Sequence, residues 1–154
     1  MKSIEIVVRT GIRPGLFDIT AECERFVAEA TRDPGDWATA DDDTEHDDTA
    51  SDAGLLTVFV PHATCGVVIM ELGAGSEADL MATLERLLPR DDRWRHRHGS
   101  PGHGADHVLP LLAPPSITIP VVGGRLALGT WQSIALLDTN ADNESRHVRL
   151  TFAV

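Results

Sequence analysis

One stretch, residues 55–72, constrains the fold of this chain more than any other. Two apolar segments rich in Val and Ile, 55–60 and 66–72, flank the polar interval Pro61-His62-Ala63-Thr64-Cys65. Segments of this composition are typical of β-strands. Because an imidazole, a hydroxyl and a thiol stand here among hydrophobic neighbours, each must find a partner in the fold or cost free energy. The stretch predicts two buried strands with polar groups at their junction and a carboxylate, Glu71, near the end.

The periodicity of the remaining chain predicts an α+β fold with a largely antiparallel sheet. Apolar and polar residues alternate at 3–9 and 146–154, which is the period of a half-buried strand. Gly123-Gly124 predicts a hairpin between strands at 116–122 and 125–129. We expect a further strand at 131–137 and a turn at 11–15. A chain that runs from strand to helix, to two strands, to helix and then to several strands is typical of this fold class.

Two helices are predicted from apolar residues at helical spacing. The first begins near Ile19, where Asp18 or Thr20 can cap the first turn. The second begins at Ser76 and ends at Pro89, and its inward-facing residues are expected to be Leu80, Leu84, Leu87 and Leu88. A short helical segment is expected at 108–112.

Length and charge narrow the classes of function. A chain of 154 residues fits one domain with its own core, so residues 1–154 are treated as a single domain. The net charge of −11 argues against nucleic acid or an anionic membrane as the main partner. Because no apolar run reaches the ~18 residues of a membrane span and no secretory signal precedes the first strand, we expect a cytoplasmic protein. Cys23 and Cys65 are expected to be reduced, buried thiols.

An acidic segment at residues 33–54 interrupts the apolar pattern. It contains Asp41-Asp42-Asp43 and Asp47-Asp48 and almost no aliphatic side chain larger than Ala. Such a segment buries too little apolar surface to offset the entropy of ordering it, so the composition predicts a flexible insert. The calcium-loop pattern of an EF-hand is not matched, because its central Gly and final Glu are out of place.

A second polar segment, residues 90–107, is rich in Arg and His. Its four imidazoles belong to His96, His98, His103 and His107. A catalytic zinc ion is bound by three protein ligands, which can be imidazoles, and keeps a fourth position open. This segment is therefore a candidate metal centre. The spacing alone is weak support, because it matches no established zinc motif. Without a metal, the same imidazoles with Arg95 or Arg97 suit a phosphate or a carboxylate.

Three motifs together resemble a known family. They are Pro61-His62-Ala63-Thr64-Cys65-Gly66 with the later Glu71, the segment from His107 to Ser116, and the run Gly124-Arg125-Leu126-Ala127-Leu128-Gly129-Thr130-Trp131-Gln132. They resemble the YjbQ family, also called the secondary thiamine-phosphate synthase enzyme family. The resemblance covers most of the chain outside the acidic insert. It implies packed antiparallel sheets with two main helices, a homotrimer, a pocket near the subunit boundary, and weak joining of a pyrimidine diphosphate to a thiazole phosphate.

The resemblance also implies roles for individual residues. Among the imidazoles that could hold a divalent metal, zinc or magnesium, it selects His62, His96 and His107. The catalytic residues would be His62, Glu71 and His107. The residues expected to bind a small phosphorylated substrate are Thr64, Arg125, Thr130, Trp131 and Gln132.

Several of these residues have a plainer structural interpretation. His62 can be a histidine satisfied at a strand end, and Glu71 reaches it only if the two strands fold back antiparallel. Trp131 can belong to the core, and Arg125 can form a surface ion pair. Cys65 fits packing better than nucleophilic catalysis, because residues three apart in a strand point to opposite faces.

One departure from the family pattern bears on the substrate. Relatives usually carry Asn-Glu-Asn where this chain has Met70-Glu71-Leu72, so two amides able to orient a ligand are missing. The chain also lacks a glycine-rich phosphate cradle, so we do not expect a fast synthase. Three functions stay open: an enzyme of the YjbQ type, a non-catalytic protein that binds a metal or a phosphorylated metabolite in the same pocket, and a structural trimer.

Overall fold

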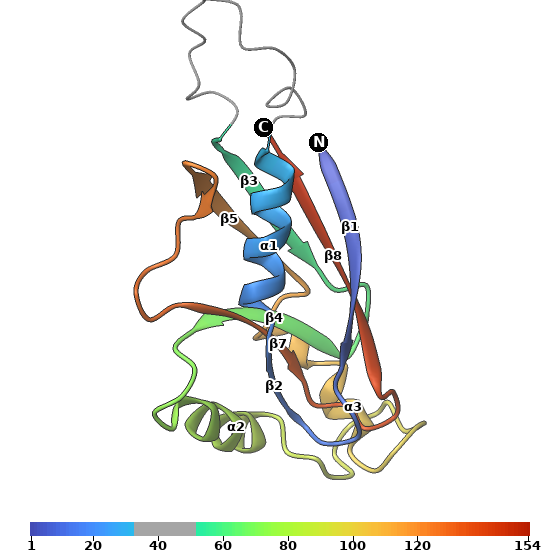
Figure 1. Ribbon diagram of the computed structural model, residues 1–154. Helices are drawn as coiled ribbons and strands as arrows, with labels where there is room; N and C mark the ends of the chain where they lie inside the picture. Colours follow the sequence, from blue (N-terminus) through green and yellow to red (C-terminus); the bar gives the residue numbers. More distant parts are fainter. Residues whose placement is uncertain (33–51) are drawn as a thin grey trace, which may run out of the picture.

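Two antiparallel sheets with helices packed around them form the described part of the chain, residues 1–32 and 52–154 of a computed structural model (Figure 1). The first sheet has the strand order β1-β8-β3-β5-β6, formed by β1 (Lys2–Arg9), β8 (Ser145–Ala153), β3 (Gly54–Phe59), β5 (Ser116–Val122) and β6 (Arg125–Leu126). The second has the order β2-β7-β4, formed by β2 (Gly15–Asp18), β7 (Ser133–Asp138) and β4 (Cys65–Met70). The α+β fold class predicted from the sequence is confirmed.

The stretch 55–72 supplies one strand to each sheet. β3 pairs with β5 and β8, whereas β4 pairs with β7, so the polar interval between them carries the chain from one sheet to the other. Gly66 permits a close crossing, because a Cβ there would lie 2.0 Å from the carbonyl oxygen of Ala113. The Val67 N–H donates to Pro114 O at 2.9 Å and so fastens that segment to β4. The two strands are therefore not paired with each other.

Helix α1 (Thr20–Thr31) covers one face of the five-stranded sheet (Figure 1). Its buried side chains are those predicted from the spacing, Cys23, Phe26, Val27 and Ala30. The predicted cap is not formed, because the N-cap residue is Ile19 and no side chain caps the first turn. The Asp18 carboxylate instead accepts the Thr20 N–H at 2.9 Å, a local contact before the helix. The core between this helix and the sheets is continuous and includes Leu56, Val58, Ile134, Leu136 and Leu150.

Helix α2 (Ser76–Leu87) packs less deeply than α1. Leu80, Leu84 and Leu88 contact a small second core around Leu109, as the spacing predicted. The prediction for Leu87 was wrong, since 58% of it is exposed. At about 100° per residue, Leu87 falls at the edge of the apolar stripe, on the side away from Met81 and Leu88.

Several boundaries differ from the sequence prediction. The strand expected at 125–129 is only Arg125–Leu126, β6. β2 was not predicted, because the expected turn at 11–15 runs directly into a strand of four residues. The strand expected at 131–137 begins at Ser133, after a turn that contains Trp131. Instead of one helical segment at 108–112, α3 (His103–Asp106) is followed by a 3-10 turn, η1 (Leu109–Leu111). The hairpin at Gly123-Gly124 is confirmed, with φ of 56° and 67° at the two glycines.

Cys23 and Cys65 are both free and buried, which confirms the prediction that they are reduced, buried thiols. Burial raises the pKa of each thiol to about 12.

Most of the acidic insert expected at 33–54, residues 33–51, lies outside the described residues. Within residues 1–32 and 52–154, no helix has the length and apolar character needed to cross a membrane.

Candidate metal centre

Four imidazoles meet at the end of the molecule formed by α3 and the loop that precedes it. His96 and His98 come from the loop, His103 begins α3, and His107 follows it. The ring centroids of His96 and His98 are 4.0 Å apart, and those of His96 and His107 are 4.1 Å apart. His103 and His107 are four residues apart, so a single helical turn places both on one side. We call His96, His98, His103 and His107 the histidine cluster.

Glycines allow the loop to fold tightly over α3. Gly99 has φ of 84°, and a Cβ there would lie 2.8 Å from His103 Nδ1. A Cβ on Gly104 would lie 2.4 Å from Trp94 Cβ. Positive φ is readily adopted only by glycine, and neither contact leaves room for a side chain. The absence of side chains at Gly99 and Gly104 therefore brings the loop histidines onto the helix.

Three members of the histidine cluster have the arrangement of metal ligands. One nitrogen from each of His96, His103 and His107 lies within 4.8 Å of the others. His107 Nε2 and His103 Nε2 are 2.9 Å apart. Two nitrogens bound tetrahedrally to one zinc ion at 2.0–2.1 Å stand about 3.3 Å apart. A shift of a few tenths of an ångström would convert this hydrogen-bonded pair into a pair of ligands.

The second nitrogen of His103 is held from behind. His103 Nδ1 lies 2.6 Å from Asp142 Oδ2 and 2.9 Å from Asn140 Nδ2. The carboxylate accepts Nδ1–H, so the Nε2 lone pair is directed at His107. A carboxylate behind a histidine ligand is the usual second partner in zinc sites, where it fixes the tautomer and the ring orientation.

A buried polar network supports this arrangement. Asp106, 1% exposed, pairs with Arg90 and accepts hydrogen bonds from Thr139 Oγ1 at 2.7 Å and Asn140 Nδ2 at 3.1 Å. Asn140 Nδ2 also donates to Asp142 Oδ2 at 3.4 Å, so this amide joins the Asp106 carboxylate to the carboxylate that holds His103. Buried polar groups that satisfy one another in this way make a region rigid.

Two members of the histidine cluster, His96 and His107, have lowered pKa values, which favours their neutral form. Loss of hydration lowers the pKa of His96, and the nearby His98 and His103 lower it further. Loss of hydration likewise lowers the pKa of His107, with His96 as the next cause. A hydrogen bond from the Ser100 backbone N–H is the main cause that lowers the pKa of Asp142. Neutral imidazoles beside an ionised carboxylate are what metal binding requires.

A cavity of about 330 Å³ opens over the histidine cluster. Its lining includes His96, His98, His103, Arg97 and Trp94. The Trp94 indole donates to Pro89 O at 2.8 Å, which holds the ring at the cavity wall. Asp91 and Asp92 also line the cavity, and the Asp91 carboxylate is paired with Arg93. An anionic ligand therefore fits best on the side formed by Arg97 and the imidazoles.

His62 lies elsewhere in the single chain. Its Nε2 accepts the backbone N–H of His147 at 3.2 Å, and the two rings stack at 6.2 Å. Burial is the main cause that lowers the pKa of His62, and Arg146 acts in the same direction. Of the predicted set His62, His96 and His107, the structure brings the last two together and adds His103.

The other residues singled out from the sequence also lie away from this cavity. Glu71 is exposed just beyond β4, and because β3 and β4 belong to different sheets the antiparallel pairing that it needed to reach His62 does not form. Thr64 is buried and Arg125 is exposed. Thr130 and Trp131 are exposed on the turn before β7, and 73% of Trp131 is accessible, so the interpretation as a core tryptophan was wrong. The lining of the histidine cavity, as far as the structure describes it, includes none of these residues.

Gln132 has a local partner instead. Its Oε1 accepts the Gly129 N–H at 2.8 Å, while its own N–H donates to Gly129 O at 2.9 Å. The amide closes the turn that displays Trp131. This accounts for the spacing between Gly129 and Gln132 without a ligand.

Sequence reasoning did not find the residues behind the histidine cluster. Asn140 and Asp142 lie in a polar segment between two strands and Asp106 lies beside the histidines, and none of the three belongs to a recognised motif. The four-residue spacing of His103 and His107 suits one face of a helix, but Gly104 between them disfavours a helix there. No local pattern links residue 142 to residue 103, because that contact depends on how β8 follows β7.

The fold and the cluster define a small two-sheet α+β protein with a surface histidine centre. Comparison with known proteins adds that a family model described as UPF0047 protein YjbQ-like matches residues 42–154. The chain belongs to this family, and the resemblance inferred from its motifs is confirmed.

Relatives from bacteria and archaea agree. A UPF0047 protein of Mycobacterium bovis is 66% identical over 104 residues, which span 68% of this chain and 81% of the relative. A UPF0047 protein of Archaeoglobus fulgidus is 30% identical over 143 residues, 93% of this chain and 95% of the relative. The crystal structure of a hypothetical protein from Aeropyrum pernix K1 matches with a TM-score of 0.79 and 27% identity, covering 99% of this chain and 98% of that one.

Proposed function

We propose that this protein is a metal-dependent enzyme acting on a small phosphorylated substrate at the histidine cluster. The observation that carries the proposal is the convergence of His96, His103 and His107, with the far nitrogen of His103 held by Asp142. Three neutral imidazoles with one open position are the donor set of catalytic zinc. Magnesium, the other metal considered from sequence, prefers oxygen ligands, so zinc fits better.

A bound divalent cation would supply a positive charge that stabilises phosphate oxygens as they become more negative. The chain's own groups complete the cavity. Arg97 offers a guanidinium to a phosphate, and Trp94 forms an aromatic wall. His98, whose ring lies 5.2 Å from that of His103, stands at the same cavity and can exchange a proton with a bound substrate.

The reaction to test first is the one that the family resemblance implies. The bond between the pyrimidine methylene carbon and the diphosphate oxygen breaks, a bond from the thiazole nitrogen to that carbon forms, and diphosphate leaves. The main electrostatic demand is stabilisation of the departing diphosphate. Arg97 and the histidine cluster meet this demand only in part, which supports weak rather than fast activity.

The homotrimer, the cytoplasmic location and the roles of His62, Glu71, Arg125 and the Thr130–Gln132 run remain part of the proposal. A site near a subunit boundary would let a second copy bring His62 to the histidine cavity, although one chain keeps them apart. Mixing inactive His62→Ala copies with inactive His103→Ala copies, after partial denaturation and refolding, should restore activity if the site is shared. Mixtures that stay inactive would confine the site to one chain.

Metal analysis of the purified protein tests the centre itself. We expect about one zinc per chain, from a three-histidine site, lost in His107→Ala and kept in His147→Ala, which changes a histidine outside the cluster. Thiamine-phosphate formation above background that disappears with the metal would support the enzyme. Stoichiometric metal without any such activity would favour the alternative, a non-catalytic metal- or metabolite-binding protein. Equal, trace metal in all three proteins would reject the centre.

A further inference from the structure

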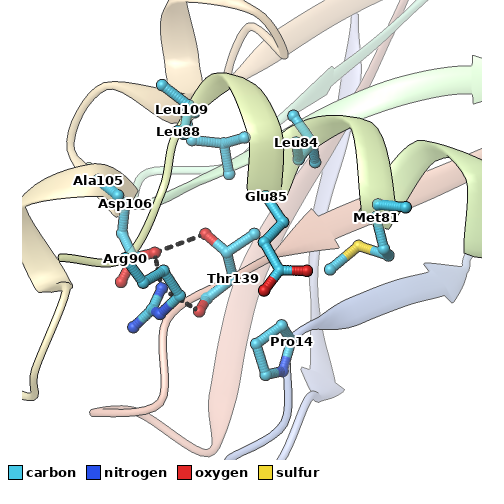
Figure 2. A pocket seen from close by; sticks show the side chains of 11 residues that line it. Pro14, Met81, Leu84, Glu85, Leu88, Arg90, Ala105, Asp106, Leu109 and Thr139 are labelled. Carbon is cyan, nitrogen blue, oxygen red and sulfur yellow. Dashed lines mark hydrogen bonds and ion pairs between the residues drawn. The ribbon is translucent and has the colours of Figure 1, made fainter.

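A second cavity, of about 340 Å³, lies between α2, α3 and the segment that enters β2 (Figure 2). It shares no lining residue with the histidine cavity. Most of its wall is aliphatic, formed by Pro14, Met81, Leu84, Leu88, Ala105 and Leu109. A concave apolar wall of this kind, with a few polar groups, is the usual form of a small-molecule site.

The polar groups of this cavity are unevenly paired. The charge of Arg90 is compensated by the buried Asp106, and Arg90 Nη1 also donates to Thr139 O at 2.9 Å. Glu85, in contrast, makes no hydrogen bond or ion pair with the described residues. Figure 2 shows its carboxylate directed across the cavity toward Pro14. Glu85 is exposed to solvent, so the cavity has one accessible carboxylate without a counter-charge among the described residues, beside its apolar wall.

We propose that this cavity binds a small organic cation, a protonated amine attached to an apolar body of about one ring. The volume is near the lower end of the roughly 300–1,000 Å³ typical of ligand sites, which limits the size of the body. Glu85 provides the counter-charge, and Arg90 has no free charge to attract an anion. The net charge of −11 on the whole chain favours a cation further. This inference is independent of the metal centre.

Three probes with the same aromatic ring and different charge test the proposal on the full-length protein. They are 2-phenylethylamine, 2-phenylethanol and 3-phenylpropionate, titrated while backbone amide shifts are followed by NMR. We expect the amine to bind about five-fold more tightly than the alcohol, the effect of one partly exposed ion pair. The carboxylate should bind most weakly, and the shifts should centre on residues 81–90 and 105–109.

Charge-neutral variants identify the counter-ion. Glu85→Gln should lower amine affinity to that of the alcohol, and alcohol binding should stay unchanged. Glu29→Gln changes an exposed glutamate of α1, away from this cavity, and should leave the affinities for all three probes unchanged. Equal affinity for amine and carboxylate in the wild type would overturn the proposal. So would full amine binding in Glu85→Gln, or no shift at this cavity with any probe at millimolar concentration.

Discussion

Replacing Asp142 with asparagine tests whether His103 is a metal ligand oriented by a carboxylate. Asp142 Oδ2 lies 2.6 Å from His103 Nδ1. In the wild type, the Ser100 N–H donates to Asp142 Oδ1 at 3.2 Å. Asparagine has the same shape as aspartate and can still accept this hydrogen bond. The substitution therefore removes the negative charge behind the imidazole and changes little else.

The size of the effect follows from the exposure of the pair. Losing such a partner lowers metal affinity by about 10- to 100-fold, or roughly 1.4–2.7 kcal/mol. Because 31% of the Asp142 side chain is exposed, water screens part of its charge. We therefore expect a loss near the lower value, about 10-fold.

Competition with a chromophoric zinc chelator at neutral pH measures the affinity. Asp91→Asn is the matched control, because Asp91 belongs to the same loop and its carboxylate binds Arg93 rather than a histidine. It should keep wild-type affinity. If Asp142→Asn binds zinc as tightly as the wild type while His107→Ala does not bind it, then Asp142 does not orient His103. If none of the variants differs, the histidine cluster is not the metal centre.

Three further predictions concern the metal-free protein. Because the pKa values of His96 and His107 are lowered in the folded protein, the unfolded chain binds more protons than the folded one at weakly acidic pH. The free energy of unfolding should therefore fall as the pH decreases from about 7 toward 5, and urea denaturation in the presence of EDTA measures it. Cys23 and Cys65, with pKa values of about 12, should resist alkylation in the folded protein. Arg146→Met should cost about 3–5 kcal/mol, since it leaves a buried carboxylate without its partner.

Each of these predictions has its own control. Replacing both His96 and His107 with glutamine should reduce the pH dependence between about 7 and 5 and leave the part that comes from His62, whose pKa is also lowered. Both thiols should react once urea unfolds the chain, and fast labelling of the folded form would contradict their burial. Adding Asp138→Leu to Arg146→Met should restore most of the lost stability. A single variant as stable as the wild type would show that the pair contributes little.

The strands and the first helix could be predicted because their patterns are local. Alternation at 3–9 follows from the two faces of β1, and the spacing from Cys23 to Ala30 follows from one helical stripe buried on a sheet. The sheet to which each strand belongs is not local. β3 and β4 have similar compositions, and only the crossing at Gly66 under Ala113 separates them.

The candidate site was predicted in part for the same reason. Composition places four imidazoles in the segment 90–107, and the family resemblance selected His96 and His107 among them. Choosing His103 over His62 required knowing that the loop folds back on α3, which depends on positive φ at Gly99 and Gly102. Asp142 reaches the cluster from the turn between β7 and β8, and no sequence period relates it to residue 103.

Asn140 and Asp106 lie between the histidine cavity and the apolar cavity, and their hydrogen bonds determine how a ligand in one cavity can affect the other. Asn140 Nδ2 lies 2.9 Å from His103 Nδ1 and 3.1 Å from Asp106 Oδ2, while Asp106 also lines the apolar cavity. A ligand that displaces Arg90 from Asp106 must redistribute the hydrogen bonds of Asn140, and with them the support of His103. Any such coupling is reciprocal, so a metal at the histidine cluster would change amine affinity by the same factor as the amine changes metal affinity. The hydrogen-bonded groups around Asp106 are largely buried and paired with one another, so the coupling depends on the Arg90–Asp106 ion pair. Ligands that leave this ion pair intact should bind independently of the metal.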